Sequence, residues 1–176
     1  IDAGGGLLPA GREVPGFVNT LLLDPYIRGL KLVLGAWKEG GFEKVDTLWR
    51  EAPESTEQVL HPERWNDSPT PVKELPPEEG WTRLARYQLG ELMTQVWLEA
   101  RLPADQVDAA AAGWDGDLMW LDQRPATPTE REEFGASHRP RLTYVSEWDS
   151  LRDADEFLAA VEEWLWKVGN ATGIEE

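Results

Sequence analysis

The chain has 176 residues, 33 of them acidic and 17 basic, which gives a formal net charge of −16. This length suits one domain or one and a half, and a hydrophobic content of 41% is enough for a core, which excludes global disorder. The negative charge repels phosphate backbones, so we expect no binding to nucleic acid. Because the sequence has no cysteine, a disulfide framework and a thiolate metal site are both excluded.

The most apolar stretch, residues 21–37, is interrupted by charged residues and a proline, so no membrane span is expected. The first residue is Ile1 rather than methionine, which predicts a mature, cleaved or trimmed product. The compartment stays open, with an extracytoplasmic or cell-envelope location as the expectation.

Changes in composition divide the chain into four parts. Residues 1–15 are rich in glycine and proline and predict an extended lead-in. Residues 16–65 predict a helical subdomain, and residues 66–80 form a proline-rich linker. Residues 81–176 mix helical and strand patterns and predict an α+β subdomain.

The helical subdomain begins with a predicted helical hairpin. Apolar residues at helical spacing from Tyr26 to Trp37 give the first helix one apolar face. Asp24-Pro25 is expected to break or kink this helix, and Gly40-Gly41 to end it. A second, short helix over residues 42–49 completes the hairpin.

Residues 53–65 contain a single predicted helical turn that is fixed at both ends. Ser55 and Gln58 have the spacing of a capping box. In this motif the Ser55 hydroxyl accepts from an amide of the first turn, and Gln58 reaches back to the Ser55 amide. Pro62 stops the turn directly after His61. A fixed turn of this kind is either part of a site or a rigid corner that docks on the core.

In the last part, a weak strand pattern at residues 81–88 precedes two helices. The first runs from Leu89 to Ala100 with the most regular apolar stripe in the chain. The second runs from Pro103 to Ala112, and Gly113 is its expected stop.

Two further strands and a helix complete the prediction. Residues 114–117 predict a turn, residues 118–121 a strand and residues 122–140 a polar connecting loop. Residues 142–148 predict a strand that pairs antiparallel with 118–121. Ser150 is the expected cap of a last helix with five inward residues, Ala154, Phe157, Leu158, Val161 and Leu165. The fold class is therefore α+β: an N-terminal helical hairpin, then helices packed on a small antiparallel sheet.

The sequence Ser-Thr-Glu-Gln-Val-Leu-His-Pro-Glu at residues 55–63 resembles the signature of a bacterial and archaeal family of zincin-like metallopeptidases. Four more segments agree in the same order: residues 24–29 with 40–41, residues 89–92, residues 110–117, and residues 148–150 leading into 153–157. In that family the zinc motif His-Glu-x-x-His lies upstream of the matched region, and this chain contains no such motif. The resemblance implies the carboxyl-terminal part of such a protein, or a relative that has lost the catalytic half.

The candidate site residues follow from this resemblance. It implies that Glu57, His61 and Glu63 face a cleft built mainly by the missing half, where they contact substrate or support the metal ligands. A catalytic zinc needs about three protein ligands, and the two histidines, His61 and His138, lie in different segments. We therefore assign no catalytic residue and no metal ligand, and expect no cofactor in this chain. Zinc is expected only if an upstream catalytic part exists. The alternative role for His61 is a hydrogen-bonded corner residue.

Three functions fit these observations. The first is a non-catalytic or degenerate zincin-like segment that acts as a binding or structural subunit, with a protein partner that includes its own N-terminal part as one option. The second is the C-terminal fragment of a zinc metallopeptidase that needs an N-terminal part bearing His-Glu-x-x-His. The third is a protein-interaction module that uses its acidic surface and some of its ten tryptophans. In each case we expect that the chain is not a peptidase on its own.

Overall fold

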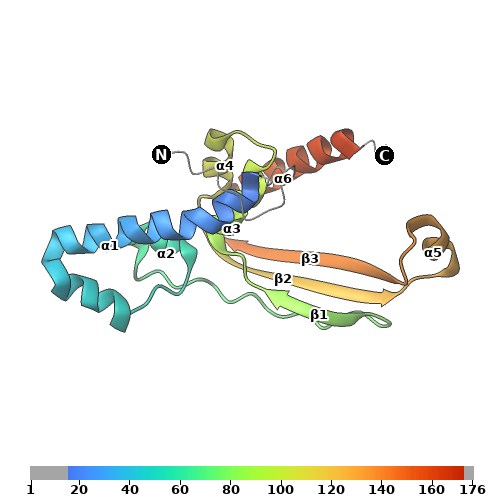
Figure 1. Ribbon diagram of the computed structural model, residues 1–176, viewed down its shortest axis with the longest axis horizontal. Helices are drawn as coiled ribbons and strands as arrows, with labels where there is room; N and C mark the ends of the chain where they lie inside the picture. The colour runs from blue at the N-terminus through green and yellow to red at the C-terminus, as the bar shows by residue number, and fades with distance from the viewer. Residues whose placement is uncertain (1–15, 173–176) are drawn as a thin grey trace, which may run out of the picture.

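The computed structural model describes residues 16–172 and shows an α+β fold (Figure 1). Helices α3 (Gly90–Glu99), α4 (Ala104–Ala111) and α6 (Leu151–Thr172) pack together on one end of a three-stranded antiparallel sheet. Helices α1 (Gly16–Arg50) and α2 (Thr56–Leu60) lie beyond that end of the sheet. The fold class predicted from the sequence is confirmed. The predicted lead-in at 1–15 lies outside the described residues.

Helix α1 is a bent helix with two arms. Its only non-helical dihedral angles are at Gly40 and Gly41, so the predicted hairpin bend is confirmed. Gly41 has a φ of +63°, a conformation that favours glycine. The break predicted at Asp24-Pro25 is wrong, because Pro25 lies inside the long arm with helical dihedral angles on both sides; the alternative, a kink, stays a prediction. A proline removes only one amide donor from a helix, and Arg28 spans this turn with an ion pair to Asp24 at 3.2 Å.

The short helix α2 begins as predicted at Ser55, whose hydroxyl accepts from the Gln58 amide at 3.3 Å. The second half of the predicted capping box is wrong. The Gln58 side chain accepts from the Glu54 amide at 2.6 Å rather than from the Ser55 amide. It also donates to the carbonyls of Trp65 and Asp67. Buried Gln58 therefore holds the short 3-10 helix η1 (Pro62–Arg64) and the following loop against α2.

Residues 66–80 contain no helix or strand and run along the sheet. The Thr70 amide donates to the Asp115 carbonyl at 2.6 Å. A Cβ at Gly116 would overlap the Thr70 carbonyl, so the close approach of these two backbones requires glycine there. Farther along, Glu78 pairs with Arg141 at 2.8 Å. The division into two subdomains at this segment stays a prediction.

Strands β1 (Thr82–Tyr87), β2 (Trp114–Pro125) and β3 (His138–Trp148) form a meander in the order β1-β2-β3. The predicted pairing of 118–121 with 142–148 is confirmed, with Leu118 opposite Val145 and Leu121 opposite Leu142. The predicted turn at 114–117 is wrong, because β2 already begins at Trp114. The predicted loop at 122–140 is wrong over most of its length, because β2 continues to Pro125, residues 128–134 form a helix and β3 begins at His138.

Cross-strand ion pairs explain why polar residues continue the strands. Buried Asp122 on β2 accepts from Arg83 on β1 and pairs with Arg141 on β3 at 3.5 Å. The charge that made this stretch resemble a loop is therefore satisfied within the sheet. Strands β2 and β3 are connected by a segment that contains a small helix, α5 (Pro128–Phe134).

The main core lies between α3, α4, α6 and the end of β3. Its buried members are Leu98, Leu102, Val107, Ala110, Phe157 and Ala160. The helices predicted at 89–100 and 103–112 are confirmed as α3 and α4. Ser150 caps α6 as predicted, accepting from the Asp153 amide at 3.3 Å.

The prediction that Leu158 and Leu165 face inward from α6 is wrong, because these side chains are 55% and 56% exposed. The inward stripe instead includes Ala160 and Trp164, and the Trp164 indole donates to the Trp97 carbonyl of α3 at 3.1 Å. No helix within residues 16–172 is long and apolar enough to cross a membrane.

Candidate functional site

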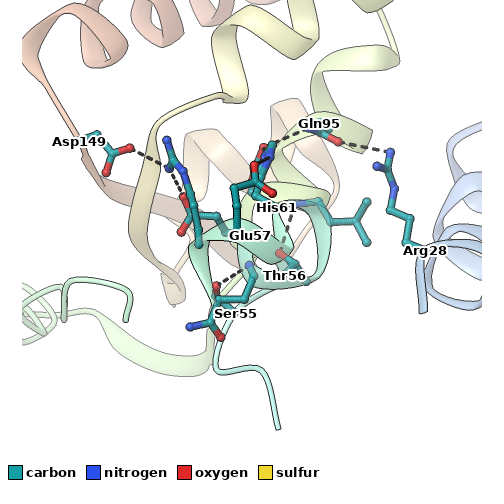
Figure 2. A network of polar contacts seen from close by, with 12 residues as sticks. Arg28, Ser55, Thr56, Glu57, His61, Gln95 and Asp149 are labelled. Carbon is teal, nitrogen blue, oxygen red and sulfur yellow. Dashed lines mark hydrogen bonds and ion pairs between the residues drawn. The ribbon is translucent and has the colours of Figure 1, made fainter. Parts of the chain in front are cut away.

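A network of polar side chains joins the helices at the end of the sheet (Figure 2). We call it the junction network and define it by seven residues from five elements or their ends: Arg28, Glu57, His61, Arg64, Glu91, Gln95 and Asp149. Two of the three residues predicted from the sequence, Glu57 and His61, belong to it.

The first branch of the junction network centres on Glu91. His61 Nε2 lies 3.0 Å from Glu91 Oε1, and Gln95 Nε2 donates to the same oxygen at 3.2 Å. Gln95 in turn accepts from Arg28 of α1 at 3.5 Å. This branch therefore connects the exit of α2 to α1 through two residues of α3.

The second branch centres on Arg64. A single nitrogen, Arg64 Nη1, donates to Glu57 Oε1 and also to Asp149 Oδ2, the latter at 2.8 Å. Asp149 directly precedes the cap of α6, so Arg64 links α2 to the start of the last helix.

The two glutamates of the network are both nearly inaccessible to solvent, with 2% exposure for Glu57 and 1% for Glu91. Burial raises the pKa of the Glu57 carboxyl, and the neighbouring Arg64 opposes this rise. Burial likewise raises the pKa of Glu91 above its ordinary value, against the opposing effect of His61. Glu91 Oε2 has no hydrogen-bond partner among residues 16–172. For both glutamates, ionisation of the carboxyl therefore destabilises the folded protein.

Backbone contacts hold Glu91 in this place. Gly90 has a φ of +75°, and a Cβ there would overlap Thr56 Oγ1, so only glycine lets α3 begin this close to α2. Thr56 Oγ1 accepts from the Leu92 amide at 3.2 Å. Asp117, buried on β2, accepts from the Leu89 and Gly90 amides at 2.7 Å each and stabilises the start of α3.

The third predicted residue, Glu63, lies at the surface, with a side chain that is 74% exposed and 3.7 Å from His61 Nδ1. The other histidine, His138, contacts Ser137 at the far end of the sheet and does not join the network. Within the described part of the chain, no group of three or more His, Asp or Glu side chains is arranged to hold a metal ion.

Sequence reasoning missed five members of the network: Arg28, Arg64, Glu91, Gln95 and Asp149. Glu91 did carry a signal, because it is a charged residue inside the apolar stripe of α3, next to Leu92. Its partner His61 is 30 residues away, so the spacing along the chain could not reveal the pair.

Two grooves adjoin the network. An apolar groove of about 430 Å³ lies between the two arms of α1, α2 and α3, and is lined by Leu32, Val45, Leu48, Val59 and Leu92 among others. Arg28 and Thr56 lie at its wall. A second groove of about 580 Å³ also lies between the arms of α1 and has charged residues, including Lys31, Lys44 and Glu51, in its lining.

Comparison with known proteins identifies a matching family. The model of a family described as a domain of unknown function (DUF8575) matches residues 47–176. The match includes all the network residues except Arg28, and it leaves out the long arm of α1. No curated protein and no solved structure matches the chain.

Proposed function

Because the chain belongs to this family, whose description assigns no activity, we propose from its structure that it is a non-catalytic binding subunit. Its recognition surface is the long arm of α1, and its ligand is a partner protein. A relationship to zincin-like metallopeptidases is kept as a second proposal, because the family description says nothing for or against it.

The supporting observation is the apolar side of α1 that faces away from the rest of the molecule. We call it the outer α1 face and define it by Leu22, Leu23, Tyr26, Ile27, Leu30, Leu34 and Trp37. Each of these side chains is at least 44% exposed, and Tyr26 is 79% exposed. A contiguous apolar patch of this kind on a soluble chain is typical of an interaction surface.

The junction network supports a structural role better than a catalytic one. Its members bond mainly to each other, and the two buried glutamates each face a cationic or imidazole partner, Arg64 or His61. The network thereby fixes α1, α2 and α3 relative to one another, which holds the outer α1 face in a defined orientation.

The test places a photo-crosslinking amino acid at Leu30 in the outer α1 face and, as a matched control, at Leu142 on the sheet. These leucines are 58% and 61% exposed. In cells of the source organism we expect a discrete, saturable adduct with one protein from position 30 and none from position 142. The absence of an adduct at position 30, or equal adducts from both positions, would contradict the proposal.

A second candidate is the carboxyl-terminal part of a zinc metallopeptidase that needs a part bearing His-Glu-x-x-His. The observation that favours it is the His61–Glu91 contact beside a buried carboxyl oxygen without a partner among the described residues. The coding sequence upstream of Ile1 decides between the candidates, since a His-Glu-x-x-His motif there favours the metallopeptidase. The chelator-washed chain alone is expected to hold no stoichiometric zinc.

A further inference from the structure

We propose that the partner of the outer α1 face is a second copy of this chain, packed with its α1 antiparallel to the first. This inference rests on the proposed binding function and names the occupant of its surface.

The first argument is the spacing of the apolar residues. Five members of the outer α1 face follow one another at intervals of four, three, four and three, namely Leu23, Ile27, Leu30, Leu34 and Trp37. This is the heptad pattern of a coiled-coil seam. The structure places these residues on a regular helical arm, with exposures from 44% to 58%.

The opposite side of the same arm faces the rest of the molecule. Ala36 is buried, and Arg28 and Leu32 line the grooves. Helix α1 is therefore apolar on two sides, only one of which the chain covers itself. A surface helix of a monomer needs a single apolar stripe, so the heptad seam is available for another helix.

The seam is complementary to itself about a two-fold axis. In an antiparallel pair centred between Ile27 and Leu30, Ile27 lies opposite Leu30 of the partner subunit, and Leu23 lies opposite Leu34 of the partner subunit. A two-fold axis repeats each of these layers, as an isologous interface requires. The four leucine and isoleucine positions then form a continuous seam.

Charge selects the antiparallel orientation. Asp24 and Lys31 each directly follow a seam residue, Leu23 and Leu30, and thus flank the seam on the same side. In the antiparallel pair this side meets its own copy, which brings Asp24 close to Lys31 of the partner subunit, twice by symmetry. In a parallel pair Lys31 would instead lie beside Tyr26 of the partner subunit.

The size and local charge of the face also fit a dimer. The exposed parts of the side chains in the outer α1 face add up to roughly several hundred Å² on each chain. This area is of the same order as the about 800 Å² per partner that stable interfaces bury. Although the whole chain has a charge of −16, residues 16–39 carry three basic and two acidic residues. The seam therefore lies in a nearly neutral segment, where electrostatic repulsion between two copies of the acidic chain is weak.

The first experiment measures mass in solution by analytical ultracentrifugation of the chain at tens of micromolar. We expect a dimer for the wild type and for the control Leu142→Glu, and a monomer for Leu30→Glu, with equal circular dichroism spectra showing that all three fold. A wild-type monomer, or a dimer that survives Leu30→Glu, would overturn the proposal.

The second experiment tests orientation with engineered disulfides, which the cysteine-free sequence makes unambiguous. We expect Leu23→Cys/Leu34→Cys to form a covalent dimer on oxidation and Leu23→Cys alone to remain uncrosslinked. Efficient crosslinking of the single variant would indicate a parallel pair and overturn the antiparallel arrangement. A photo-crosslink from position 30 to a different protein would refute the second copy but keep the binding function, whereas no crosslink at all would refute both.

Discussion

At the scale of single residues, the buried carboxyl of Glu91 carries a pH dependence with a definite sign. Burial raises its pKa above 4.5 in the folded protein, so its ionised form destabilises the fold. The penalty is absent below pH 4.5 and grows as the pH rises through the raised pKa. It is fully present above that value.

We therefore predict that Glu91→Gln, which cannot ionise, removes this loss of stability. Urea unfolding of wild type and variant at several pH values from 4 to 8 should show a stability difference that moves in favour of the variant as pH rises. Glu132→Gln is the matched control, because Glu132 is exposed on α5, away from the junction network, and its curve should follow the wild type. A difference between Glu91→Gln and wild type that is constant with pH would contradict the argument.

Glu130 shows the opposite sign. Its carboxylate accepts from the two terminal nitrogens of Arg124, Nη2 at 2.7 Å and Nη1 at 2.8 Å, and from the Thr127 amide at 2.9 Å. These bonds, those from Arg124 first, lower its pKa from 4.5 to about 2. The stabilisation is present above pH 4.5 and is lost as the pH falls through about 2.

Carbon-detected NMR titration of the side-chain carboxyl should accordingly place the Glu130 midpoint near pH 2. In Arg124→Gln, which removes the main cause, the midpoint should return toward 4.5. A wild-type midpoint already near 4.5 would show that the pair does not persist in solution.

At the scale of elements, the start of α2 depends on its cap. We predict that Ser55→Ala destabilises the protein by about 1 kcal/mol, because it leaves the Gln58 amide without its acceptor. Urea melts provide the measurement. Ser68→Ala, at an exposed position in the 66–80 segment, is the control and should not move the unfolding midpoint. An equal effect of the two substitutions would contradict the role of Ser55 as a cap.

The contact between α2 and α3 depends on the absence of a side chain at Gly90, and comparison with Gly80 separates this effect from the backbone strain that both glycines avoid. Gly90 and Gly80 have similar φ values, +75° and +81°, but only at Gly90 would a Cβ overlap a neighbour, Thr56 Oγ1. Alanine at either position carries a backbone cost of about 1–2 kcal/mol. We predict a larger loss for Gly90→Ala than for Gly80→Ala in denaturant melts. Equal losses would mean that α2 adjusts freely.

Regular apolar spacing made several elements predictable from the sequence. The stripe beginning at Leu89 predicted α3, and the β-branched and aromatic run at 142–148 predicted β3 and its antiparallel pairing with 118–121 of β2. The continuation of β2 through Asp122 was not predictable, because the arginines that neutralise it come from two other strands. A local pattern carries no information about such partners.

The candidate site divides in the same way. Glu57 and His61 were named because residues 55–63 have a recognisable sequence, but their partners Arg64 and Glu91 were not. The Glu91–His61 contact depends on how closely α3 approaches α2, a distance that tertiary packing alone determines.

At the scale of the whole molecule, the charge of −16 predicts no measurable affinity for DNA or RNA at physiological salt. Filter binding with duplex DNA and with single-stranded RNA at about 150 mM salt would measure this. Retention that weakens steeply as salt is added would reveal a local basic surface and contradict the prediction.

The hairpin end at α5 has a practical consequence for work in living cells. Helix α5 is held by its own capping box between Thr127 and Glu130, and it has no buried residue. It lies at the opposite end of the sheet from α1 (Figure 1). Such an exposed, self-contained tip tolerates a guest sequence. A fluorescent protein inserted between Gly135 and Ala136, directly after α5, would therefore report the location of the chain while leaving both the outer α1 face and the junction network untouched.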